Sequence, residues 1–193
     1  MEEECRLGGG VMTKNKGYTL VEMIIVIAIM AILGGVSFLT IGVIRQAKRQ
    51  SAASTLDNQI SNCLIKTKAI SPSTNGKDAP LCMVIKKRTD GTYAIMNGYI
   101  QGGNITDETG NVLNPDNDAD CEAILSKEIV KIEYMPSTST QQWSASDMVI
   151  QFIKSDGSTQ YGGGTYKLYV GKSTQELYAT LYLDSVSGNH YIK

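Results

Sequence analysis

The sequence has very few of the residues on which most enzyme chemistry depends. Among its 193 residues there is one histidine, His190, close to the C-terminal end. The patterns CxxC, HExxH and the glycine-rich phosphate loop are absent. A serine or cysteine nucleophile would have to meet His190 in space, and no local pattern brings one to it. We therefore expect a protein that is not an enzyme and uses no cofactor, with His190 exposed on a terminal strand.

Charge and backbone composition exclude further classes. The net charge is −1 and the pI is about 5.9, so nothing indicates an overall attraction to nucleic acid or anionic lipid. Four prolines and 19 glycines are too few for a disordered or fibrous protein. The length is ample for one globular domain with a real core and too short to argue strongly for two.

What the sequence does contain is one long apolar segment. Residues 23–44 have no charged side chain, and these ~22 residues would form a helix ~33 Å long, against a hydrocarbon core of ~30 Å. A buried helix of a soluble core is seldom apolar all round for this length, so we predict a membrane span. A secretory signal is cut after its apolar run, whereas the plausible cut here lies before it. The helix would then remain on the mature protein.

The start of this segment carries a specific motif. Lys16-Gly17-Tyr18-Thr19-Leu20-Val21-Glu22, followed by the apolar run, resembles the class III signal of type IV pilins and type II secretion pseudopilins. The resemblance implies that prepilin peptidase cuts between Gly17 and Tyr18 and methylates the Tyr18 amine. It also implies that Glu22 is needed for assembly. An ordinary membrane anchor is the alternative, but it has no need of a carboxylate as costly in lipid as Glu22.

This interpretation divides the chain into three parts. Residues 1–17 are the leader, and we interpret residues 1–11 as an extension upstream of a translation start at Met12, because the Gly8–Gly10 codons would resemble a ribosome-binding run. Residues 18–44 form the membrane-spanning and filament-core half of a helix. Residues 45–193 form the globular head, including the amphipathic half of that helix.

Flanking charge and the resemblance disagree about orientation. Lys14 and Lys16 precede the span, while Arg45, Lys48 and Arg49 follow it. The positive-inside rule thus slightly favours a cytoplasmic head, whereas the resemblance places the head outside. We follow the resemblance, because the excess is one residue and large domains translocate despite it.

Beyond the span we predict that the helix continues to about Lys68, where Ser71-Pro72 would end it. Its second half is amphipathic. The expected buried face comprises Ile44, Ala47, Ala52, Leu56, Ile60, Cys63 and Leu64.

The rest of the head is predicted to be an antiparallel sheet that this helix covers. A hairpin signal at Asp90-Gly91 separates two of the segments. The predicted strands are 81–88, 92–100, 129–135, 147–154, 165–170 and 176–184. The result is an α+β fold with the lollipop outline of a pilin.

Alternating residues assign the faces of two strands. Val130, Ile132 and Tyr134 are expected on one face of their strand, opposite Lys131 and Glu133. In the last predicted strand, the expected apolar face comprises Leu177, Ala179, Leu181 and Leu183, and the opposite face comprises Tyr178, Thr180 and Tyr182.

Three cysteines lie after the expected cut: Cys63, Cys82 and Cys121. They could form one disulfide that joins helix to sheet, which we favour. They could also hold zinc with His190 or an aspartate, or remain free and buried.

The acidic stretch 114–122 resembles the start of a calcium loop. Cys121 stands where an EF-hand has glycine, however, and Lys127 where it has the bidentate glutamate. We therefore name no metal ligands and favour a loop in which Asp118 or Asp120 caps a short helix over 123–125, with calcium binding as the alternative.

Two basic clusters, Arg45/Lys48/Arg49 and Lys86-Lys87-Arg88, could contact the phosphates of DNA, and the first could instead lie at lipid headgroups. Without a wider basic face, DNA is a weakly supported partner. Tyr178 and Tyr182 form a short aromatic edge that could pack between subunits.

The sequence thus predicts the structural subunit of a type IV pilus. Its partners would be copies of itself, related pilins, prepilin peptidase, the membrane assembly machinery and, before assembly, the lipid bilayer. It would be a single-pass inner or cytoplasmic membrane protein and then part of an extracellular filament. The alternatives are a pseudopilin of a type II secretion or competence system, and an anchored enzyme or binding protein.

Overall fold

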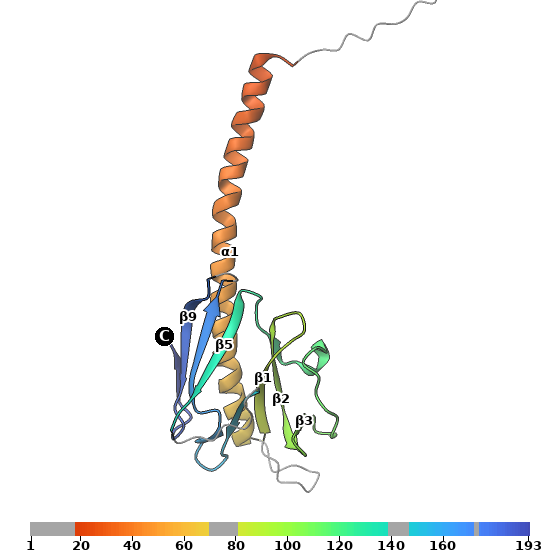
Figure 1. Ribbon diagram of the computed structural model, residues 1–193, viewed down its shortest axis with the longest axis vertical. Coiled ribbons are helices and arrows are strands. Elements are labelled where there is room, and N and C mark those ends of the chain that lie inside the picture. The colour runs from red at the N-terminus through yellow and green to blue at the C-terminus, as the bar shows by residue number, and fades with distance from the viewer. Residues whose placement is uncertain (1–17, 70–80, 139–146, 172–173) are drawn as a thin grey trace, which may run out of the picture. The chain divides into compact units, whose positions relative to one another are not determined.

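The computed structural model describes residues 18–69, 81–138, 147–171 and 174–193 (Figure 1). The side chains of residues 36–39 are not described. The chain divides into two compact units, Met1–Val43 and Ile44–Lys193, and each is considered by itself.

One helix, α1, spans Leu20–Ala69 and is 50 residues long. Its predicted bounds, Tyr18 and about Lys68, are confirmed to within two residues. In the first unit the apolar side chains of α1 are exposed, with Met30 67% and Ile32 66% accessible. Among the described residues, α1 is the one helix long and apolar enough to cross a membrane.

In the second unit α1 is amphipathic, as expected. Leu56, Ile60 and Cys63 are completely buried, and Ala52 and Ala53 nearly so. Ile44 and Ala47, which we expected on this face, are exposed because the packed core begins only at Ala52. The covered part of the helix is therefore its last five turns.

The strands form two antiparallel sheets where we expected one. The first has the order β3-β2-β1-β6-β7, with β4 also paired to β2; the second has the order β10-β9-β8-β5. The strands of the first sheet are β1 Leu81–Lys87, β2 Tyr93–Gln101, β3 Asn104–Thr106, β4 Ala123–Ile124, β6 Met148–Phe152 and β7 Thr159–Tyr161. Those of the second are β5 Ile129–Pro136, β8 Gly164–Val170, β9 Glu176–Leu183 and β10 His190–Ile192.

The predicted hairpin at Asp90-Gly91 is confirmed. Strands β1 and β2 pair in register on either side of this turn. Within the turn, Gly91 adopts a positive φ of 85°. Only glycine reaches that backbone region without steric cost.

A buried tyrosine links the two sheets. The backbone N–H of Ile132 in β5 donates a hydrogen bond of 3.1 Å to the Tyr93 hydroxyl of β2. Tyr93 is 5% exposed and belongs to the main apolar cluster, which also contains Leu56 of α1 and Leu168 of β8. One core is therefore shared by the helix and both sheets, and the strands run roughly alongside the covered part of α1 (Figure 1).

Two β-bulges correct the predicted faces. In β9 the register skips Tyr178, so Leu177 turns outward with 53% exposure while Tyr178 packs against the core. Ala179, Leu181 and Leu183 are buried as expected. In β5 the register skips Val130, so Ile129, and not Val130, lies in the core with Ile132.

Candidate functional site

The predicted processing site lies at the start of the described chain. Gly17 falls outside the described residues. Tyr18 is 82% exposed, and Thr19 directly precedes the first helical residue, Leu20. The backbone N–H of Met23 donates to the Thr19 carbonyl at 3.2 Å, which makes Thr19 the N-cap of α1.

Glu22 and Thr19 form a capping box. The Glu22 backbone N–H donates to the Thr19 hydroxyl oxygen at 3.2 Å, while the Thr19 backbone N–H donates to Glu22 Oε2 at 2.8 Å. The Thr19 hydroxyl also donates to Glu22 Oε2, at 3.1 Å. Two N–H groups that a helix start leaves without partners are thereby satisfied reciprocally.

This arrangement gives Glu22 a role inside a single chain. A carboxylate at the third helical position lies at the positive end of the helix dipole and accepts backbone donors that lipid cannot satisfy. The Thr-x-x-Glu spacing before an apolar run is a recognisable signal of such a box. Thr19 was assigned no role from the sequence, although the Thr-x-x-Glu spacing identifies it as a capping residue.

A comparison with known protein families identifies the same segment as a motif. Residues 12–38 match the family model described as the prokaryotic N-terminal methylation motif. The chain therefore carries the N-terminal methylation motif, which is the class III prepilin signal of type IV pilins and pseudopilins. Together with the long apolar helix packed on antiparallel sheets, this confirms the recognised motif and the pilin-like α+β architecture.

No curated protein and no solved structure matches the chain.

The expected disulfide is not formed in the structure, where Cys63, Cys82 and Cys121 are all free thiols. Cys63 belongs to the cluster beneath α1, whereas Cys82 belongs to a second apolar cluster on the other face of β1. Burial raises the pKa of each of these two thiols to about 12. Cys121 lies partly buried against the second cluster, and its Sγ lies within hydrogen-bonding distance of the carbonyls of Pro115 and Asn117, at 3.4 and 3.2 Å.

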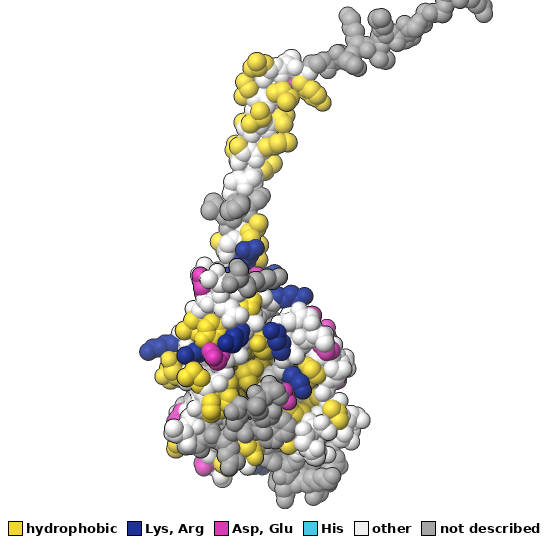
Figure 2. All heavy atoms as spheres, in the orientation of Figure 1, with side chains coloured by type: hydrophobic (Ala, Val, Ile, Leu, Met, Phe, Trp, Pro, Cys, Tyr) yellow, Lys and Arg dark blue, Asp and Glu magenta, His cyan; other side chains and the backbone are white. Residues whose placement is uncertain are grey.

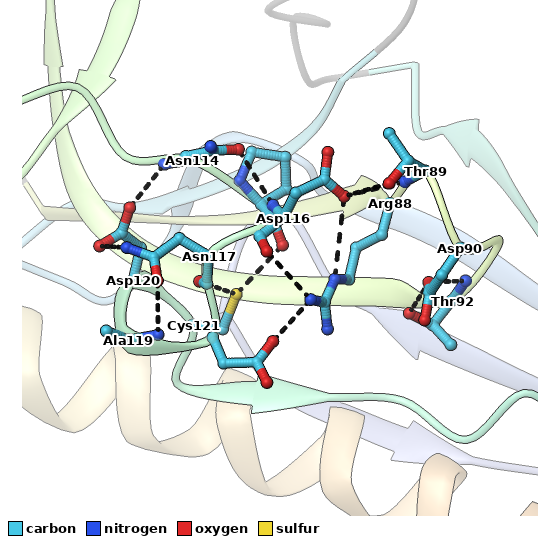
Figure 3. Close-up of polar contacts among 12 residues, drawn as sticks. Arg88, Thr89, Asp90, Thr92, Asn114, Asp116, Asn117, Ala119, Asp120 and Cys121 are labelled. Carbon is cyan, nitrogen blue, oxygen red and sulfur yellow. Dashed lines mark hydrogen bonds and ion pairs between the residues drawn. The ribbon is translucent and has the colours of Figure 1, made fainter.

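The acidic stretch 114–122 is held by hydrogen bonds and ion pairs within the protein (Figure 3). Asp116 accepts from the backbone N–H and hydroxyl of Thr89, and Asp118 pairs with the Arg88 guanidinium. Asp120 accepts from the Asn114 backbone N–H. The described residues contain no group of three or more His, Cys, Asp or Glu side chains placed to hold a metal ion.

The predicted helix over 123–125 is replaced by strand β4. The short helix of this region is a 3-10 turn at Asp118–Asp120, and its N-cap is Asn117, whose side chain accepts from the Ala119 backbone N–H. Ala123 and Ile124 pair instead with β2, where a free strand edge was available.

The basic clusters are largely paired within the head. Lys86 lies 3.5 Å from Asp147, and Lys87 lies over the Tyr93 ring at 5.8 Å. Arg49 lies 3.6 Å from Glu128. These contacts engage the charges of Arg49, Lys86 and Lys87 within the head.

His190 lies against α1 and is not exposed as we expected, since its side chain is 12% accessible. Its Nε2 lies 2.9 Å from the Ser61 hydroxyl and 3.7 Å from Asp57 Oδ1, while Nδ1 lies 3.3 Å from the Gly188 carbonyl. Asp57 and Ser61 meet the same ring nitrogen, so the three residues do not have the relay geometry of a hydrolase triad. They fasten β10 to the helix.

Proposed function

We propose that this protein is the structural subunit of a type IV pilus, polymerised from the membrane through α1. The observation that carries the proposal is the methylation motif at residues 12–38, which opens an exposed apolar helix that is joined to a folded head. The leader, residues 1–17, would be removed by prepilin peptidase between Gly17 and Tyr18. Residues 18–44 would then form the filament core and residues 45–193 the head.

In this proposal, assembly uses the Glu22 carboxylate of the capping box. Cleavage creates an amine at Tyr18 that stays cationic after one methylation, one helical turn from Glu22. In a monomer the Glu22 carboxylate is engaged by Thr19. In the filament it meets the Tyr18 amine of a neighbouring subunit, which neutralises two charges away from water and sets the axial register.

The head has a structural role in this proposal. The heads of the subunits would cover the bundled helices of the filament. The partners of the protein would be copies of itself and related pilins. The subunit waits in the inner or cytoplasmic membrane before it enters the surface filament.

Electron microscopy of sheared surface fibres, with immunogold labelling of the head, tests the proposal. We expect long filaments that carry the label along their length and that disappear when the gene is deleted. A deletion that abolishes protein secretion and leaves surface fibres unchanged would instead identify a secretion pseudopilin.

A further inference from the structure

The outer face of the four-stranded sheet, turned away from α1, carries a row of lysines. Lys193 exchanges backbone hydrogen bonds with Thr180, which is paired with Lys167, which is paired with Glu133. Lys131 lies on the same face, two residues from Glu133, and its Nζ is 3.7 Å from that carboxylate. Lys131 and Lys167 therefore lie beside the Glu133 carboxylate and Lys193 extends the row, so the side chains of the row carry an excess of positive charge.

A row of exposed aromatic and apolar side chains lies beside the lysines. Tyr191 is paired with Tyr182, and their rings stack with centroids 4.9 Å apart. Tyr191 is 57% exposed, and Met135, at the far end of the same row, is 46% exposed. We call these two rows the Lys-Tyr face. Figure 2 shows basic and hydrophobic side chains side by side over this part of the head.

The opposite side of the head is acidic. Residues 89–126 contain seven Asp or Glu residues and no Lys or Arg. Three cations from outside the segment pair with some of them, namely Lys66, Arg88 and Lys127. Val112 lies within this segment and is 61% exposed. We call this surface the acidic side; in Figure 1 it surrounds β3, across the head from β9 and the C-terminal end.

The two surfaces are complementary in charge, and each exposes apolar side chains. We infer that the Lys-Tyr face of one copy binds the acidic side of a second copy, so that heads join head to tail. This inference rests on the proposed filament function and adds the contact between heads. A contact between two different surfaces of one molecule is heterologous, and such contacts build open helical filaments when their rotation does not close.

The physical roles within this contact follow from the residue types. Tyrosine is enriched at the centres of protein interfaces, where Tyr182 and Tyr191 supply rigid apolar area. The lysines and the opposing carboxylates steer and orient the encounter more than they add affinity. Two Lys-Tyr faces brought together would place like charges in contact, which disfavours a symmetric dimer through this face.

Cysteine cross-linking in filaments tests the contact. Lys193→Cys and Val112→Cys are combined in a full-length chain that also carries Cys121→Ser, and sheared filaments are treated with a short bifunctional maleimide. A head-to-tail contact gives a ladder of dimers, trimers and higher multimers on a denaturing gel. The matched control combines Val112→Cys with Ile153→Cys, an exposed position on the turn after β6, and should give no ladder.

Each outcome of the cross-linking either supports or overturns the contact between heads. A ladder from Lys193→Cys with Val112→Cys, and from neither single variant, supports the contact. Filaments without a ladder overturn it, as do dimers from Lys193→Cys alone, which would show a symmetric contact. Absence of filaments from the wild-type chain would instead remove the proposed function and this contact with it.

A charge reversal provides an independent measurement. Lys167→Glu combined with Lys193→Glu should lower the yield of sheared filaments by about tenfold, because like charges then meet across the contact. Lys154→Glu, on the turn between β6 and β7, is the control and should leave the yield unchanged. An unchanged yield from the double variant would overturn the contact.

Discussion

The proposed function gives Glu22 two successive roles, in the capping box and in filament assembly, and its substitution separates them. Glu22→Ala should be made, inserted and cleaved, because nothing in those steps uses the carboxylate. It should enter filaments poorly, since neither the Thr19 N–H nor a neighbour's amine then has its acceptor. Glu22→Asp should be partly impaired, because a shorter side chain reaches the same partners less well.

The measurement is the ratio of sheared filaments to cellular mature protein in a strain that carries only the variant. Thr19→Ala is the informative companion. It loses the N-cap hydroxyl, worth ~1 kcal/mol of helix stability, but keeps the carboxylate, so assembly should be impaired less. Wild-type assembly by Glu22→Ala would reduce Glu22 to a helix-capping residue.

Gly17 is predicted to be essential for maturation. The peptidase must approach the backbone closely at the cut, and glycine presents no side chain to obstruct it. Gly17→Val should therefore leave uncut precursor in the membrane, visible as a larger band on an immunoblot. Mature-sized protein from this variant would contradict the assignment of the cut.

The cysteines should differ in reactivity according to burial. The raised pKa of Cys63 and of Cys82, about 12 for each thiol, leaves almost no thiolate at neutral pH, and both side chains are out of reach of reagents. Alkylation of the native mature protein should label Cys121 alone. Under denaturing conditions without reductant all three should react, and loss of two of them would reveal a disulfide.

At the scale of the elements, the bulge in β9 determines which leucine of the strand contributes to the stability of the head. Leu181 is completely buried, whereas Leu177 is 53% exposed although it lies four residues earlier in the same strand. Leu181→Ala should lower the free energy of unfolding by ~2–5 kcal/mol as a buried truncation. Leu177→Ala should change it by less than about 0.5 kcal/mol. Urea denaturation of both variants checks this, and equal losses would place the bulge elsewhere.

In this strand, the alternation of apolar residues predicts the buried side chains only in part. Alternation correctly buried Ala179, Leu181 and Leu183, because side chains of a regular strand change faces at every residue. It failed at Leu177 because a bulge inserts one residue and reverses the faces beyond it. No residue in this strand announces the bulge, which arises from pairing with Tyr169 of β8.

The division into two sheets was also beyond sequence patterns. Hairpin turns identify neighbouring strands, as at Asp90-Gly91, but they do not say where a sheet ends. Where the two sheets meet, the backbone N–H of Ile132 donates to the Tyr93 hydroxyl and not to a strand of the first sheet, a side-chain contact that no sequence pattern predicts. The candidate site was more predictable, because the processing motif and the Thr-x-x-Glu box are both local in sequence.

At the scale of the whole molecule, the two units should separate in stability. The core begins at Ala52, so a fragment of residues 44–193 keeps every side chain of the main cluster. It should fold as a soluble domain with a cooperative thermal transition by circular dichroism. A fragment of residues 70–193 loses Leu56, Ile60 and Cys63 and exposes both sheets, so it should not fold. A cooperative transition in the shorter fragment would show that the sheets are stable without α1.

The alignment of the strands with the covered part of α1 has a mechanical consequence. Tension in a filament would enter each head along the helix axis, through side chains such as Leu56 and Ile60 that interlock with the sheets. The strands run roughly along that axis (Figure 1), so the pull slides neighbouring strands past one another instead of peeling them apart. In this geometry the backbone hydrogen bonds of a ladder bear the load together, and no single bond fails first. A filament built from such heads would stretch at its helices before its sheets came apart.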